Sequence, residues 1–145
     1  MQWNNKFFYP KSTRSIVQGS RHYSVNDELL PSVTTILKAT ETEEKKAKLA
    51  EWKNRVGHKQ AEIISREATS RGSSMHDYLE KFLLGKLNMD LLGDNTREKM
   101  MADQIIENGL RDKLSEIWGC EATLYYPGKY AGAADCIGIY ENKET

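Results

Sequence analysis

The chain has few cysteines, no extended apolar stretch and no net charge. Its two cysteines, Cys120 and Cys136, are too few for a disulfide framework or a four-cysteine metal site. No stretch of about 18 apolar residues occurs, so the sequence predicts no membrane span and no membrane partner. Residues 1–10 also lack the apolar core of a secretory signal. Together these absences favour a reducing, cytoplasmic setting.

The charge balance excludes one class of nucleic-acid protein but not another. Lys and Arg total 21, and Asp and Glu total 21, so the formal net charge is zero. This balance argues against a protein that coats DNA without sequence preference. It is compatible with a nuclease, in which acidic metal ligands offset basic phosphate contacts. A hydrophobic fraction of 39% with three Trp, seven Tyr and three Phe indicates a folded chain rather than a disordered one.

The sequence predicts one α+β domain over residues 1–145, with helices before most of the strands. Residues 1–30 are expected to be irregular, with a hairpin that turns at Gly19-Ser20. Residues 31–118 are expected to be helical. Residues 119–145 are expected to form two strands, and two strands alone make a marginal sheet.

Local signals set the expected helix boundaries. Ser32 is a natural N-cap for a short helix, and a second helix from Glu43 is expected to end at Gly57. Gly72-Ser73-Ser74 interrupts the next helical pattern, where either a break or a tolerated bend is possible. A further helix is expected from Thr96 to about Ile117, with apolar residues at helical spacing.

Asp135 is the first residue that could carry chemistry. It stands among small and apolar residues, in Gly132–Gly138, so its carboxylate is expected in or near a packed sheet. An unpaired buried carboxylate is costly, so it needs a metal, a cation or hydrogen bonds. The alternative is an aspartate at a turn or strand end that forms a salt bridge.

Two more side chains could join Asp135. His76 and Glu80 share a helix face, since they are four residues apart, and either could bind a divalent metal. Glu121 lies on the strand before Asp135 and could face the same cleft through cross-strand placement. The alternatives are a His76–Glu80 pair without a ligand role and an ordinary solvent-facing Glu121.

These motifs, taken in order, resemble one nuclease family. The matching segments are RHYSV, LPSVTTIL, a Trp and a Gly five residues apart, RGSSMHDYLEKFLLG and CEATLYYPGKYAGAADCIGIY, at 21–25, 30–37, 52–57, 71–85 and 120–140. This set is similar to the RecB-like branch of the PD-(D/E)XK nucleases, and most similar to the phage and mitochondrial genome maintenance exonuclease group. The resemblance covers about residues 20–140. It implies helices followed by part of a restriction-endonuclease-like core sheet.

The resemblance also implies a chemistry. In that family the residue matching His76 is a metal ligand, and the residue matching Asp135 bridges the metal and the scissile phosphate. The implied cofactor is Mg²⁺ or Mn²⁺, and Glu121 is a further candidate ligand. The implied substrate is DNA with a free or single-stranded end. Asp135 is therefore the expected catalytic residue of a metal-dependent DNA exonuclease.

One family element is not found. The family has a further strand with D-x-K or E-x-K, whose Lys activates the attacking water. Glu141-Asn142-Lys143 spells E-x-K, but it follows Asp135 too closely, so Glu141 and Lys143 are expected to be exposed turn residues. The returning strand would begin after Thr145. The sequence therefore predicts a partial nuclease domain with little or no activity.

Three residues near the motifs are candidate DNA phosphate contacts: Arg71, Ser73 and Lys129. Each could equally be a surface or capping residue. One alternative function is a non-catalytic module that binds DNA or a protein and derives from a nuclease fold. Another is a helical interaction protein without metal, although the motifs of His76 and Asp135 argue against it.

Overall fold

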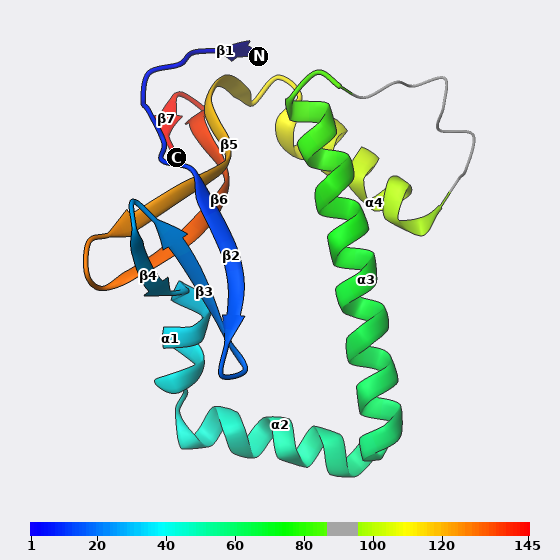
Figure 1. The fold of residues 1–145 in the computed structure, drawn as a ribbon. Helices are drawn as coiled ribbons and strands as arrows, with labels where there is room; N and C mark the ends of the chain where they lie inside the picture. The colour runs from blue at the N-terminus through cyan, green and yellow to red at the C-terminus, as the bar shows by residue number, and fades with distance from the viewer. Residues whose placement is uncertain (87–95) are drawn as a thin grey trace.

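The computed structural model describes residues 1–86 and 96–145, and it confirms the predicted α+β fold (Figure 1). The described residues form two small sheets joined by helices. The helical elements are α1 (Val33–Ala39), α2 (Glu43–Val56), α3 (His58–Leu83), α4 (Arg97–Ile105) and a short π-helix, η2 (Ile106–Leu110). The strands are β1 (Gln2–Trp3), β2 (Ser12–Val17), β3 (Ser20–Val25), β4 (Glu28–Pro31), β5 (Leu114–Tyr126), β6 (Tyr130–Tyr140) and β7 (Lys143–Glu144).

The first sheet is an antiparallel meander of β2, β3 and β4. The expected hairpin is present, with Gln18 and Gly19 in the turn, both at positive φ. Strand β4 adds a third member, so the N-terminal segment is more regular than the sequence predicts. One face of this sheet packs on the start of β6, where Val25 and Ala131 are fully buried.

The second sheet has the order β1-β5-β6-β7, and its long hairpin of β5 and β6 carries most of its pairing. Strand β5 begins at Leu114, so the predicted helix to Ile117 ends too late. The reason is local: the chain leaves the helix after η2, and Leu114 and Ile117 are buried against α3 instead. The strand region expected from residue 119 therefore begins five residues earlier, at Leu114.

Helix α1 holds the two sheets together. Ser32 caps α1, as predicted, and its side chain accepts a hydrogen bond from the Thr35 amide at 3.0 Å. The Ser32 amide donates to the Arg21 carbonyl in β3, and Ser32 also forms a parallel bridge with Ala131 in β6. Because Gly132 has no side chain, Val33 of α1 approaches β6 closely. These contacts fix α1 against both sheets.

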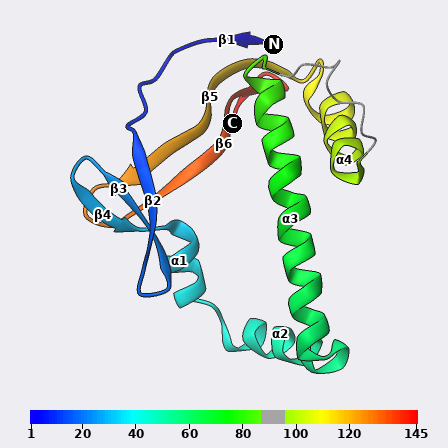
Figure 2. The ribbon, with the colours of Figure 1, turned by 45° about the vertical axis from the view of Figure 1, so that its right-hand side comes forward.

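Helices α1, α2 and α3 form an open frame beside the sheets (Figures 1 and 2). Gly57, at a φ of 87°, ends α2 and precedes α3, which makes the corner between them. Helix α3 then runs without interruption through Gly72, so the expected break or bend is a continuous helix. The far end of α3 returns to the second sheet, where Leu83 packs against Leu114 and Ile117.

The contact at the end of α3 positions the candidate site. The Trp3 indole donates a hydrogen bond to the Leu83 carbonyl at 2.9 Å, which fastens the helix end to β1. His76 and Glu80 precede Leu83 by seven and three residues, which places all three on one helix face. Since Leu83 faces the sheet, His76 and Glu80 also face it.

Candidate metal centre

His76, Glu121 and Asp135 come from three different elements and meet at one point. Each offers one ligand atom, and these atoms all lie within 4.8 Å of one another. The His76 Nδ1 and Asp135 Oδ1 atoms are 3.7 Å apart. The predicted convergence of His76 and Asp135 is therefore confirmed, and Glu121 joins them, which is one of the two placements that the sequence left open.

The β5–β6 pairing explains why the two carboxylates are neighbours. Cys120 pairs with Cys136 and Ala122 pairs with Ala134, so Glu121 lies opposite Asp135. Glu121 has a φ of 49°, which departs from regular strand geometry. The backbone at Glu121 is therefore locally distorted where the candidate ligand leaves the strand.

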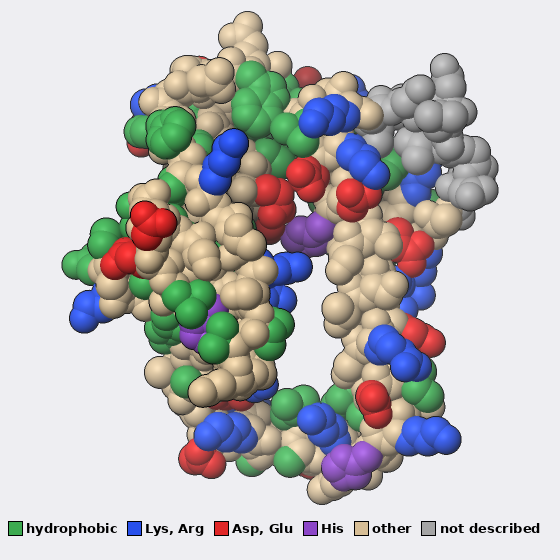
Figure 3. Space-filling model, in the orientation of Figure 1, with side chains coloured by type: hydrophobic (Ala, Val, Ile, Leu, Met, Phe, Trp, Pro, Cys, Tyr) green, Lys and Arg blue, Asp and Glu red, His purple; other side chains and the backbone are tan. Residues whose placement is uncertain are grey.

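The carboxylate of Asp135 is open to solvent, which corrects the expectation that it lies in a packed sheet. The side chain of Asp135 is 68% exposed and that of His76 is 52% exposed. Ala131 packs against the first sheet and Gly132 lies against Val33 of α1, whereas Asp135 faces His76 of α3. A space-filling view shows acidic side chains and a histidine gathered at one end of an opening between α3 and the strands (Figure 3).

Negative charge accumulates at this point. Partial burial raises the pKa of Glu121 most, and the nearby charges of Asp135 and Glu80 and a hydrogen bond with Asp135 raise it further. His76 acts in the opposite direction and lowers that pKa. A bound divalent cation would offset this mutual repulsion, which is the electrostatic condition for a metal site.

Glu80 belongs to the surroundings of the site. Its charge also raises the pKa of the Cys120 thiol, so the Glu80 side chain lies near both β5 residues, Cys120 and Glu121. The structure brings Glu80 to the same side of the sheet as His76, as the shared helix face predicts.

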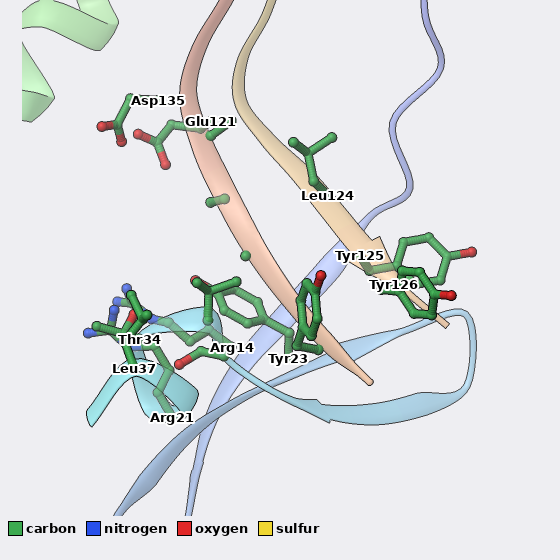
Figure 4. Close-up of a pocket in the computed structure, with 16 residues that line it drawn as sticks. Arg14, Arg21, Tyr23, Thr34, Leu37, Glu121, Leu124, Tyr125, Tyr126 and Asp135 are labelled. Atoms are coloured by element: carbon green, nitrogen blue, oxygen red, sulfur yellow. The ribbon is translucent and has the colours of Figure 1, made fainter. Parts of the chain in front are cut away.

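A groove leads away from the two carboxylates along β6. It has a volume of about 670 Å³ and is bounded by the first sheet, α1 and the β5–β6 hairpin. Glu121 and Asp135 lie at one end of it, Arg14 and Arg21 near α1, and several tyrosines towards the hairpin (Figure 4). The side chains of Arg14 and Arg21 both extend towards Thr34 of α1 in that view.

The three predicted phosphate contacts do not line this groove. Arg71 and Ser73 lie on α3, before His76, and Ser73 is exposed there. Lys129 lies in the exposed turn between β5 and β6, where its amide donates a hydrogen bond to the Tyr126 carbonyl. Lys129 therefore lies near the tyrosine end of the groove, and the phosphate role of all three residues stays a prediction.

Glu141 and Lys143 are exposed, as predicted, and Glu141 lies in a turn with Asn142. Lys143 differs from the expectation in one respect, because it already pairs with Tyr140 as the first residue of β7. The returning strand therefore begins at Lys143 and not after Thr145. Because Tyr140 lies five positions along β6 from Asp135, Lys143 is about 16 Å from the acidic pair and cannot act there.

The arginines of the groove are the residues that the sequence analysis misses. Arg14 pairs with Tyr23 and Arg21 pairs with Ile16, so both arginines stand on the face that carries the buried Tyr23. The signal in the sequence was that each arginine lies two residues, or one strand pair, from a core residue on the same strand face.

Comparison with known protein families and with curated proteins finds no match to this chain, so the assignment of the site rests on its geometry.

Proposed function

We propose that this chain is a metal-dependent DNA nuclease module with its cation at His76, Glu121 and Asp135. The observation that carries the proposal is the convergence of these side chains from α3, β5 and β6 within 4.8 Å. Residues so far apart in the sequence meet only through the packing of α3 on the hairpin. The adjoining groove contains two arginines that suit a phosphate backbone.

The donor set fits Mg²⁺ or Mn²⁺. Two carboxylates supply the oxygen ligands that hard cations prefer, and an imidazole nitrogen is compatible with Mn²⁺. All three side chains are exposed, so a cation and a phosphodiester could reach them together. A bound cation in such a site polarises a phosphoryl oxygen and lowers the pKa of a bound water.

The three candidate ligands have different proposed roles. Glu121 and Asp135 supply the negative charge that attracts the cation, and His76, as a neutral imidazole, would supply a nitrogen ligand from α3. Asp135 also lines the groove, so it is the proposed residue at the boundary between cation and phosphate. These roles are consistent with the family that the motifs resemble.

One observation favours weak turnover. No lysine lines the groove among the described residues, and Lys143 lies well away from the acidic pair. A nuclease without a group to position and activate its water loses about a hundredfold or more in rate. A non-catalytic DNA-binding module is therefore the second candidate function, and activity measurements separate the two.

Metal binding tests the proposal directly. We expect Mn²⁺ titrated calorimetrically to bind the wild-type chain at one site, and His76→Ala or Asp135→Ala to weaken that binding by about tenfold or more. Asp77→Asn is the matched control, because Asp77 neighbours His76 but pairs with Lys81 at 2.6 Å. Equal losses in Asp77→Asn and Asp135→Ala, or no binding by the wild type, would refute the metal centre.

Cleavage of end-labelled linear DNA in Mn²⁺ distinguishes the two candidate functions. We expect slow turnover that disappears in Asp135→Ala and persists in Asp77→Asn. Metal binding without any Asp135-dependent cleavage would favour the binding module. Fast turnover would show that a water-activating group acts at the site despite the absence of a lysine from the described groove.

A further inference from the structure

We infer that the groove beside the acidic pair binds a stretch of single-stranded DNA, with Arg14 and Arg21 on its phosphates and Tyr126 and Tyr130 against its bases. The inference rests on the proposed function in one respect, because the groove ends at the proposed metal centre. It identifies the substrate-binding surface of that site, which the sequence motifs do not include.

The two arginines supply the positive charge. Both side chains are exposed, and neither forms an ion pair with a carboxylate in the part of the chain that the structure describes. Antiparallel pairing of β2 and β3 puts them on one face of the meander, where both line the groove and extend towards Thr34 of α1 (Figure 4). Two guanidinium groups that line one groove suit the phosphates of a nucleic-acid backbone.

Charge is separated along the groove. The carboxylates of Glu121 and Asp135 lie at one end, and they repel a phosphate backbone until a cation neutralises them. The arginines lie beside α1, apart from the carboxylates, so they hold the backbone where no carboxylate opposes it. A strand held there would extend towards the metal centre.

The tyrosines favour unpaired bases over a duplex. The rings of Tyr126 and Tyr130 are stacked, with centroids 6.0 Å apart and 29° between their planes. Such a cross-strand pair stabilises a hairpin by itself. However, the two residues remain 58% and 42% exposed and line the groove, so they offer ring surface to a ligand. Only unpaired bases can stack on such rings, because duplex bases are already stacked on one another.

The spacing along β6 matches a short segment of strand. Tyr130 and Asp135 are five residues apart, which is roughly 16 Å in a strand. At about 3.4 Å per stacked nucleotide, this length accommodates about five nucleotides. A single strand stacked at Tyr130 would therefore bring a phosphodiester to Asp135.

Fluorescence anisotropy tests the inference without metal. The probe is fluorescein-labelled oligothymidylate of about 12 nucleotides, a usual site size for such grooves, measured in EDTA. We expect the double variant Arg14→Ala/Arg21→Ala to bind about tenfold more weakly or worse and to lower the slope of log affinity against log salt by about 1.4. Tyr126→Ala/Tyr130→Ala should also lose about tenfold, and Tyr126→Phe/Tyr130→Phe should retain binding.

The matched control removes the same charge elsewhere. Arg97 and Arg111 flank α4 and η2 and are exposed, so Arg97→Ala/Arg111→Ala should bind nearly as well as wild type. Circular dichroism establishes that each variant is folded. No binding by the wild type, or an equal loss in the control, would overturn the inference. Equal competition by unlabelled duplex would overturn the preference for single strands.

The design separates this inference from the metal centre. Arg14→Ala/Arg21→Ala should bind Mn²⁺ normally, whereas His76→Ala should bind oligothymidylate normally in EDTA. If Mn²⁺ fails to bind but the arginine-dependent DNA binding is observed, the groove assignment stands and the metal centre fails. If Mn²⁺ binds and the groove variants have no effect on DNA binding, the metal centre stands alone.

Discussion

Cys120 and Cys136 are opposed on neighbouring strands next to the acidic pair, yet their surroundings suppress their reactivity. Both pack against the cluster formed by Leu83, Leu114 and Ile117. Burial raises the pKa of the Cys120 thiol to about 11, and the charges of neighbouring groups contribute to that rise. Burial likewise raises the pKa of Cys136. These cysteines therefore act as small packing residues under α3 and not as nucleophiles.

The pH dependence of alkylation checks this interpretation. In a Cys136→Ser variant, burial still raises the pKa of Cys120, so little of it is a thiolate at pH 8 and reaction with iodoacetamide should be slow. A raised pKa places the rise in rate at higher pH, and we expect about tenfold per pH unit up to pH 10. The same variant unfolded in guanidinium chloride is the control. A plateau near pH 9 in the folded protein would contradict the raised pKa.

The residues of the acidic site were predictable, but their environment was not. His76 and Asp135 stand in recognisable motifs, and Glu121 follows from cross-strand placement, so their meeting could be foreseen. The solvent exposure of Asp135 could not be foreseen, because small apolar neighbours normally indicate burial. Arg14 and Arg21 share a strand face with the buried Tyr23, which the alternation of the strands could have shown, but nothing in the sequence shows that α1 folds beside that face.

Gly72 in α3 and Gly138 in β6 have opposite effects on the stability of the elements that contain them. Gly72 lies inside α3 with open space where a Cβ would be, so its presence only weakens the helix. Gly138 lies in β6 opposite Ile117, where a Cβ would collide with the backbone carbonyl of Glu116. The first glycine is dispensable for the structure, whereas the second is required by the bulged pairing of β5.

Alanine substitutions at these two glycines should change stability in opposite directions. We expect Gly72→Ala to raise the free energy of unfolding by about 0.5–1 kcal/mol, because alanine favours a helix interior. We expect Gly138→Ala to lower it by about 2–3 kcal/mol through overpacking. Urea unfolding followed by circular dichroism measures both. Stabilisation by Gly138→Ala would show that β5 can shift to admit a methyl group.

Element boundaries show where sequence patterns succeed and fail. Side-chain caps are local, so the start of α1 at Ser32 and the end of α2 at Gly57 were predicted correctly. The change from η2 to β5 has no local signal, since Leu114 and Ile117 also fit a helical spacing. Their burial against Leu83 decides the outcome, and that contact depends on the return of α3 to the sheet.

The whole molecule is unusually open. Its accessible surface is 10,806 Å², whereas a compact protein of 16.6 kDa exposes about 7,600 Å². Among residues 1–86 and 96–145, buried side chains form three separate clusters, at the first sheet, between α3 and α4, and where α3 meets β5. Helix α2 contains no buried residue. The frame that holds the groove and the acidic site is therefore anchored mainly at its ends.

Hydrogen exchange should reveal this uneven anchoring. We expect backbone amides of residues 43–56 to exchange much faster than those of residues 114–126, because α2 buries nothing while β5 buries Ile117 and Ala122. Mass spectrometry of peptides covering the two segments measures the difference. Equal protection would mean that α2 is covered in solution, and dilution of the sample would then show whether a second copy covers it.

The pairing of β1 with β5 joins two segments that lie more than a hundred residues apart in the sequence. Gln2 lies beside Glu116 in parallel register, and the Asn4 amide donates a hydrogen bond to the Ile117 carbonyl at 2.9 Å. During synthesis the first strand emerges from the ribosome more than a hundred residues before its partner. Strand β1 therefore has no partner until β5 is made, and its Trp3 also holds the end of α3 through the hydrogen bond to Leu83. The placement of His76 beside the two carboxylates is therefore supported by a strand that lies more than seventy residues before it in the sequence.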